Sequence, residues 1–156
     1  MSGQTPNHEI VPFETTHHVR DHCLCLHAQR AARMLARRFD EALRPLGLKS
    51  GQFSLLMALN RPRPPTLGSV AALLAMDRTT LTANLKPLER DRLIEVRPDG
   101  KDRRARRLVL TERGRGLLFR AVPVWTATHR DIEGMLAAGG ADRLRADLNA
   151  LLGRDE

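Results

Sequence analysis

Aromatic residues are scarce in this chain. It has no tyrosine, one tryptophan and four phenylalanines, so aromatic side chains make up 3% of its 156 residues. Proteins that recognise single-stranded RNA commonly stack its bases on exposed aromatic rings. This scarcity argues against an RNA-binding protein of that kind.

Long apolar runs and cysteines are also scarce. No run approaches the roughly 20 apolar residues that a membrane helix needs. The N-terminal "MSGQTPNHEIVPF" lacks the basic and apolar segments of an export signal. The two cysteines, Cys23 and Cys25, do not make a disulfide framework. We therefore expect a cytoplasmic protein with reduced thiols and no membrane partner.

Enzymatic motifs are missing from the sequence as well. It contains no glycine-rich phosphate loop, no recognisable nucleophile motif and no carboxylate pair in an apolar context. We therefore expect no enzymatic activity and no cofactor.

Positive charge, in contrast, is abundant. Lys and Arg total 26 against 18 Asp and Glu, which gives a formal net charge of +8. Such an excess favours a polyanionic partner, most simply nucleic acid.

The apolar pattern predicts a mainly α-helical fold with one small β-hairpin. Apolar residues at helical spacing predict a continuous first helix from Thr15 to Leu43. Ser50, Thr66 and Asp77 are placed to start the next three helices, with Ser50 and Asp77 as N-caps. The strand-like runs "LIEVR" and "RRLVLT" then flank Asp99-Gly100, a strong turn signal. Further helices follow from Thr111 to the C-terminal region.

This order of elements is the plan of a winged helix-turn-helix. The helix after Asp77 has an apolar face and a polar face, and the N-terminal side chains of such a helix can meet base edges in the major groove of DNA. The hairpin tip is rich in basic residues, which suit phosphates or the minor groove. The candidate DNA-binding residues are Arg78, Thr79, Thr80, Thr82, Asn84 and Lys86 on the helix, and Lys101, Arg103, Arg104, Arg106 and Arg107 on the hairpin.

The stretch "DRRARRLVLTERG" resembles the wing motif of the MarR family of bacterial transcription regulators. The matching residues are Asp102, Arg104, Leu108, Leu110, Thr111 and Gly114. The resemblance extends over roughly residues 20–153. It implies that residues 77–86 form the recognition helix, that Arg104 enters the minor groove and that Asp102 holds the wing in place.

The resemblance also implies a homodimer. We expect a flexible arm at residues 1–12 and a MarR-type domain at 13–156. Within that domain, the winged helix-turn-helix would span about 50–111, and the dimerisation helices about 15–45 and 112–153. Family members usually carry glycine where Arg92 stands, so Arg92 would adopt a strained left-handed backbone if the turn is kept.

As a member, the protein would be a sequence-specific regulator that reads pseudo-palindromic double-stranded DNA. It would commonly act as a repressor, released by a small ligand or by thiol oxidation. The alternative is a non-specific or architectural DNA-binding protein. A small-molecule inducer such as an aromatic acid would occupy a pocket for which the candidates are Arg30, Arg33, Met34, Phe53 and Met57.

The stretch "HHVRDHCLCLH" poses a separate question. On a continuous helix, His18, His22 and Cys25 share one face, and Cys23 and His27 share another. Neither face supplies the four ligands of a closed zinc site, unless His8, His17 or a second subunit completes it. We therefore assign no metal.

Thiol sensing is the other possibility for this stretch. Counted back from Leu46, Cys25 lies at the position of the reactive cysteine in the organic-hydroperoxide-sensing branch of the family. The tyrosines that assist that cysteine are missing, because Ser50 and Phe53 occupy their positions. A disulfide between Cys23 and Cys25 is disfavoured on a continuous helix, where the two side chains point apart. Cys25, and secondarily Cys23, remain candidate redox sensors.

Overall fold

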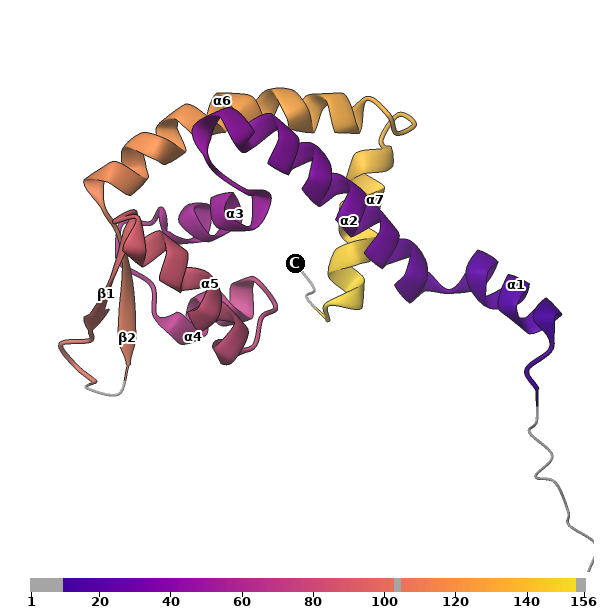
Figure 1. The fold of residues 1–156 in the computed structure, drawn as a ribbon, viewed down its shortest axis with the longest axis horizontal. Coiled ribbons are helices and arrows are strands. Elements are labelled where there is room, and N and C mark those ends of the chain that lie inside the picture. Colours follow the sequence, from indigo (N-terminus) through magenta and orange to yellow (C-terminus); the bar gives the residue numbers. More distant parts are fainter. Residues whose placement is uncertain (1–9, 103–104, 154–156) are drawn as a thin grey trace, which may run out of the picture. The chain divides into compact units, whose positions relative to one another are not determined.

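The computed structural model describes residues 10–102 and 105–153. Two compact units divide the chain, Met1–Leu35 and Ala36–Glu156. The mainly helical architecture with a single antiparallel hairpin confirms the predicted fold class (Figure 1). Among the described residues, none of the helices combines the length and apolar character required to cross a bilayer.

The first unit does not contain the single continuous helix that the periodicity predicted. Helix α1 spans Phe13–His22 and α2 spans Leu24–Leu43, and they are separated at Cys23, whose backbone is extended (φ −74°, ψ 107°). The prediction of one helix over residues 15–43 is therefore wrong.

Cys23 caps the helix that follows it, which explains the break. Its Sγ accepts the backbone N–H of Leu26 at 3.4 Å, and its carbonyl accepts that of His27 at 3.1 Å. A side-chain acceptor on the N–H three residues ahead is what an N-cap residue supplies to the open end of a helix. Because of this break, residues before and after Cys23 do not share a continuous helical face.

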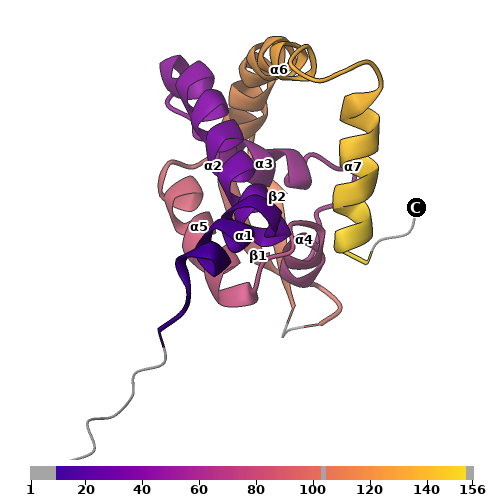
Figure 2. The same ribbon diagram turned by 90° about the vertical axis from the view of Figure 1, so that its right-hand side faces the viewer.

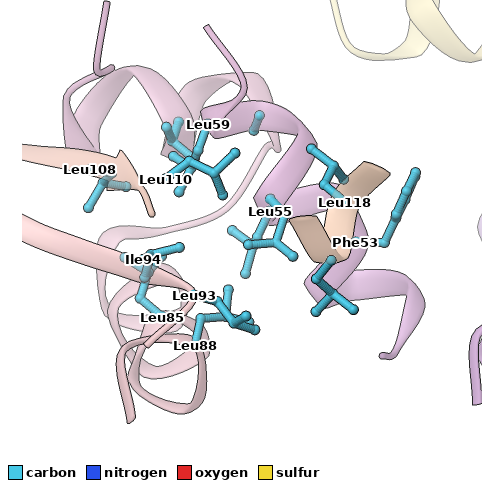
Figure 3. Packing of buried hydrophobic residues seen from close by; sticks show 14 of the residues in the cluster. Phe53, Leu55, Leu59, Leu85, Leu88, Leu93, Ile94, Leu108, Leu110 and Leu118 are labelled. Carbon is cyan, nitrogen blue, oxygen red and sulfur yellow. The ribbon is translucent and has the colours of Figure 1, made fainter. Parts of the chain in front are cut away.

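The second unit holds the hydrophobic core. Leu55 and Leu59 of one helix, Leu85 and Leu88 of another and the hairpin residues Leu108 and Leu110 belong to one cluster (Figure 3). After the end of α2, its elements are a 3-10 turn at Arg44–Leu46, α3 (Ser50–Leu59), α4 (Leu67–Leu73), α5 (Arg78–Arg90), β1 (Ile94–Pro98), β2 (Arg106–Leu110), α6 (Glu112–Glu133) and α7 (Gly140–Leu151).

Helix α3 starts differently from the prediction. Its N-cap is Lys49, and Ser50 is already the first helical residue. The Ser50 N–H donates to Oδ1 of Asp40 on α2 at 2.7 Å, and the Lys49 N–H donates to Oε1 of Gln52 at 3.0 Å. The carboxylate of Asp40 and the side-chain amide oxygen of Gln52 thus satisfy two backbone donors at the start of α3, and the prediction of Ser50 as the N-cap is wrong by one residue.

The hairpin pairs Ile94 with Leu110 and Val96 with Leu108. This register turns Ile94, Leu108 and Leu110 into the core, as the alternating pattern predicted. Helix α6 begins directly after β2 and leads through a loop into α7 (Figure 2). The strands therefore connect the core to a projecting wing.

The junction between α5, β1 and α6 explains part of the wing motif. Thr111 caps α6 by accepting the Gly114 N–H at 3.0 Å, and its hydroxyl lies 2.8 Å from the carbonyl oxygen of Arg92. A Cβ on Gly114 would lie 2.1 Å from the carbonyl oxygen of Leu93, far inside van der Waals contact. Glycine is therefore required where α6 passes the turn before β1.

Arg92 adopts the left-handed backbone expected at this position, with φ +58°. A non-glycine residue in this region carries a strain of about 1 kcal/mol. Its N–H donates to the Glu89 carbonyl and its own carbonyl lies beside Thr111, so the neighbouring elements hold it in this conformation.

Replacing Arg92 with glycine should therefore stabilise the fold. We expect Arg92→Gly to raise the free energy of unfolding by about 1 kcal/mol, because the strain disappears. Urea denaturation followed by circular dichroism measures the change. The control is Lys86→Gly at an exposed position inside α5, which should lower stability by about 1 kcal/mol. A loss of stability in both variants would contradict the strain at Arg92.

Candidate nucleic-acid interface

Helix α5 presents a polar face beside the core. Leu81, Leu85 and Leu88 point inward and are almost fully buried. The predicted residues Arg78, Thr79, Thr80, Thr82, Asn84 and Lys86 are all exposed. The helix thus separates its packing face from its solvent face as the sequence indicated.

Asp77 fixes the start of this helix. Its carboxylate accepts the Thr80 N–H at 2.8 Å and the Thr80 hydroxyl at 2.6 Å, which confirms the predicted N-cap. These bonds lower the pKa of Asp77, with the Thr80 hydroxyl as the largest cause. The cap therefore stays ionised at neutral pH and holds the first turn of α5 rigid.

The threonine hydroxyls are partly engaged within the helix. Thr80 donates to Asp77, and Thr82 donates to the Arg78 carbonyl at 2.7 Å. A hydroxyl that has given its proton still offers lone pairs, and the threonine methyl group remains. Toward a ligand these two residues thus present acceptors and methyl groups, while Arg78 and Lys86 carry the positive charge.

The wing is held at its base by Asp99, which the sequence analysis treated only as a turn residue. Its carboxylate accepts the Lys101 N–H at 3.0 Å and the Arg107 Nε at 2.9 Å, and its side chain is 11% exposed. The Lys101 bond first, and then the Arg107 guanidinium, lower the pKa of Asp99. Arg107 also donates to the Pro64 carbonyl at 2.9 Å. Arg107 thus joins the wing base to the loop before α4, and its expected role in DNA binding stays a prediction.

The remaining wing candidates divide into two groups. Lys101, Asp102 and Arg106 are exposed around the tip. Arg103 and Arg104 lie outside the described residues, so the expected roles of Arg104 and of its neighbour Asp102 stay predictions.

An apolar groove lies between α3, α4 and α6. The predicted pocket residues Phe53 and Met57 line it together with Val122 and Trp125, and its volume is about 460 Å³. Phe53 stacks on Trp125 with ring centroids 6.1 Å apart, and Met57 is 41% exposed. This volume falls within the range of small-molecule sites. Val122 and Trp125 on α6 were not predicted as lining residues, because α6 is distant in sequence from α3. Arg61, which was also not predicted, lies just beyond the end of α3.

The other predicted pocket residues lie in the first unit. Met34 is about half exposed, and Arg33 donates to the Gln29 side chain at 3.4 Å on the same helix. Arg30 is an exposed residue of α2. Their participation in a ligand pocket stays a prediction.

His18, His22 and His27 make contacts within the first unit's own helices. His18 and His22 stack with ring centroids 4.3 Å apart, and Nδ1 of His22 lies 2.9 Å from the His18 carbonyl oxygen. Nδ1 of His27 lies 2.9 Å from the Cys23 carbonyl oxygen. Within residues 10–102 and 105–153, no three histidine, cysteine or carboxylate side chains gather as a metal site requires. His8 lies outside these residues.

The cysteines differ in their surroundings. Cys23 is half-buried and caps α2, whereas Cys25 is exposed and its Sγ accepts the side-chain amide of Gln29 at 3.2 Å. The break at Cys23 also removes the continuous-helix argument against a bond between the two thiols.

These features define a winged helix-turn-helix protein, and comparisons with known proteins identify its family. A model of the MarR family matches residues 46–105. The transcriptional regulator MosR of M. tuberculosis, solved in complex with DNA, is 37% identical with a TM-score of 0.77, and the match covers 84% of this chain and 94% of MosR. The chain belongs to the MarR family.

Other relatives are regulators too. The transcriptional repressor CouR, solved with a 23-mer DNA duplex, is 28% identical with a TM-score of 0.75, over 87% of this chain and 96% of CouR. The transcriptional activatory protein BadR of Rhodopseudomonas palustris is 35% identical over 55% of this chain. The match covers 51% of the length of BadR and 60% of the length of a second curated relative, so the chain spans only about half to two thirds of these proteins.

Proposed function

We propose that this protein is a homodimeric, sequence-specific DNA-binding transcription regulator, most simply a repressor. The observation that carries the proposal is the rigidly capped helix α5, whose exposed polar face carries Arg78 and Lys86, next to a basic wing fixed at its base by Asp99 and Arg107. A helix in the major groove and a wing on the flanking DNA are the two contacts that such a module makes. The complexes of MosR and CouR with DNA support the same partner.

Exposed apolar faces support the dimer. Helix α7 buries none of its residues, and Leu144, Leu148 and Leu151 on it are between 43% and 68% exposed. In the first unit, Phe13 and Leu24 are also largely exposed. Apolar faces of this kind commonly mark protein interfaces. We propose that the helices outside the winged domain pair with those of a second copy, which gives the two-fold symmetry of a pseudo-palindromic site.

Binding to DNA from the gene's own upstream region tests the function by fluorescence anisotropy. We expect two chains per site and a marked preference over unrelated duplex. Arg78→Ala should weaken specific binding by about 1–3 kcal/mol in each of the two half-sites and relax the sequence preference, because it removes a base contact from each chain. Lys101→Gln should weaken binding to all sequences and lower the salt slope by about 2, because it removes one phosphate contact from each chain of the dimer.

The exposed Arg120 on α6 provides a charge-matched control, since Arg120→Gln should leave DNA affinity unchanged. Equal affinity for every duplex, with a steep salt dependence, would contradict the specific regulator and favour the architectural alternative.

We also propose that a small aromatic acid binds in the apolar groove and releases the DNA. The groove is lined by apolar and aromatic side chains, and among its described lining residues Arg61 alone is charged. An apolar slot with one cation suits an aromatic ring that carries a carboxylate.

Ligand binding should change the fluorescence of Trp125, the single tryptophan of the chain. We expect a panel of aromatic carboxylates to contain a compound that shifts this emission and weakens DNA binding. Met57→Glu should abolish both effects, because a second carboxylate in the groove repels the first, while the half-exposed position tolerates the change. Gly51→Glu, at an exposed position of α3 that does not line the groove and where an added side chain meets no neighbour, should leave both effects intact. A response that survives Met57→Glu would place the ligand elsewhere.

Thiol oxidation is the second proposed route of release. The exposed Cys25 is accessible to a peroxide. Its thiolate attacks one peroxide oxygen, the O–O bond breaks, and the other oxygen leaves as hydroxide or water, so that Cys25 becomes a sulfenic acid. We expect hydrogen peroxide to weaken DNA binding by the native protein and Cys25→Ser to remove this effect in the same anisotropy assay. An equal response in the variant would exclude Cys25 as the sensor.

A further inference from the structure

A second, basic groove lies between the wing turn and the loop that joins α3 to α4. It has a volume of about 730 Å³ and separates the loop between α3 and α4 from the wing turn. Arg61 and Arg63 come from the loop, Lys101 comes from the wing, and Thr66 and Ser69 come from the start of α4. None of the predicted DNA-binding residues lies in the loop.

The charges in this groove are unbalanced. Asp99 is the single acidic residue among its described lining residues, and Arg107 is paired with it at 2.8 Å. The positive charge in excess of this ion pair comes from three exposed side chains, those of Arg61, Arg63 and Lys101. A groove with this balance fits an anionic partner.

The loop is fixed in position relative to the wing. Arg107 joins Asp99 to the Pro64 carbonyl, the Leu108 N–H donates to the Pro65 carbonyl at 3.0 Å, and Thr66 forms an antiparallel bridge with Arg107. Pro62, Pro64 and Pro65 further restrict the loop backbone, because each ring locks its φ angle. Arg61 and Arg63 are thus carried on a preorganised segment.

We propose that Arg61 and Arg63 bind phosphates of the DNA backbone alongside the wing, and so extend the DNA contact beyond the recognition helix and the wing tip. The inference rests on the proposed function. In a helix-turn-helix, the helix that precedes the recognition helix crosses the sugar-phosphate backbone. Here that helix is α4, whose first residues line the groove, while the wing forms the opposite wall. A phosphate chain that crosses α4 therefore meets the loop arginines.

Salt-dependent DNA binding by Arg63→Gln tests this proposal on the full-length protein. Arg63 is tested first, because Arg61 also lines the apolar groove and its substitution could affect ligand binding as well as DNA binding. Each phosphate contact contributes about 0.9 to the slope of log affinity against log salt. Because two chains bind each site, the variant loses two such contacts. Its slope should be smaller by about 1.8, so that its loss of affinity is about 12-fold larger at 50 mM than at 200 mM salt. The loss should be equal for operator and unrelated duplex.

A neutral backbone provides the second arm. Replacing single phosphates by methylphosphonates along the operator should reveal positions that weaken native binding. At one of these positions, the substitution should cost nothing in Arg63→Gln, while it should still weaken binding by Arg63→Lys, which keeps the charge, and by the control Arg120→Gln.

The outcomes separate this inference from the proposed function. An unchanged affinity and salt slope in both Arg61→Gln and Arg63→Gln, while Lys101→Gln still lowers the slope, would overturn the loop contact and leave DNA binding intact. A native protein that binds no duplex would overturn the proposed function itself. Full sensitivity of Arg63→Gln to every methylphosphonate would also reject the contact.

Discussion

The close passage of α6 over the turn before β1 is the constraint on which the rest of the winged domain depends. Gly114 leaves room for the Leu93 carbonyl, and the Thr111 hydroxyl bonds to the Arg92 carbonyl while it caps α6. Because this junction joins the end of α5, the first strand and the start of α6, it sets the position of the polar helix relative to the wing. Arg92 is held in a left-handed backbone conformation at the same point. The tight turn between α5 and β1 therefore forms with local backbone strain.

A second set of bonds lies at the base of the wing turn, where the paired strands end. Asp99 and Arg107 join the wing turn to the Pro64 carbonyl of the loop between α3 and α4. The carboxylate is almost buried and its pKa is lowered, so the tie persists at neutral pH. These bonds, together with the Leu108 N–H to Pro65 carbonyl bond, hold the loop backbone against the hairpin, so the loop and the wing carry their cations on the two sides of one groove.

Local signals predicted much of the fold. Thr66 and Asp77 were recognised as helix starts, and both accept the expected backbone N–H. The Asp-Gly turn and the alternating strands gave the hairpin, because side chains of period two are read directly from the sequence. Ser50 is not the N-cap, because the cap position of α3 lies one residue earlier, at Lys49, and the Ser50 N–H donates to Asp40, ten residues earlier in the chain. The break between α1 and α2 was not predicted, because the spacing of apolar residues carries no information about a cysteine sulfur that accepts a backbone N–H of the next turn.

By itself, the sequence determined the order of the helices and strands after α2, the capped polar helix, the basic wing and the family motif. Each of these depends on residues a few positions apart, whose geometry follows from helical or strand periodicity. Only the tertiary structure decided that Arg107 faces Asp99 and Pro64, that Trp125 and Phe53 share a groove, and that Arg61 and Arg63 lie across from Lys101. Arg107 is 8 positions from Asp99 and 43 positions from Pro64. Only the folding of the chain brings such residues together, because the periodicity within one helix or strand carries no information about which separate elements meet.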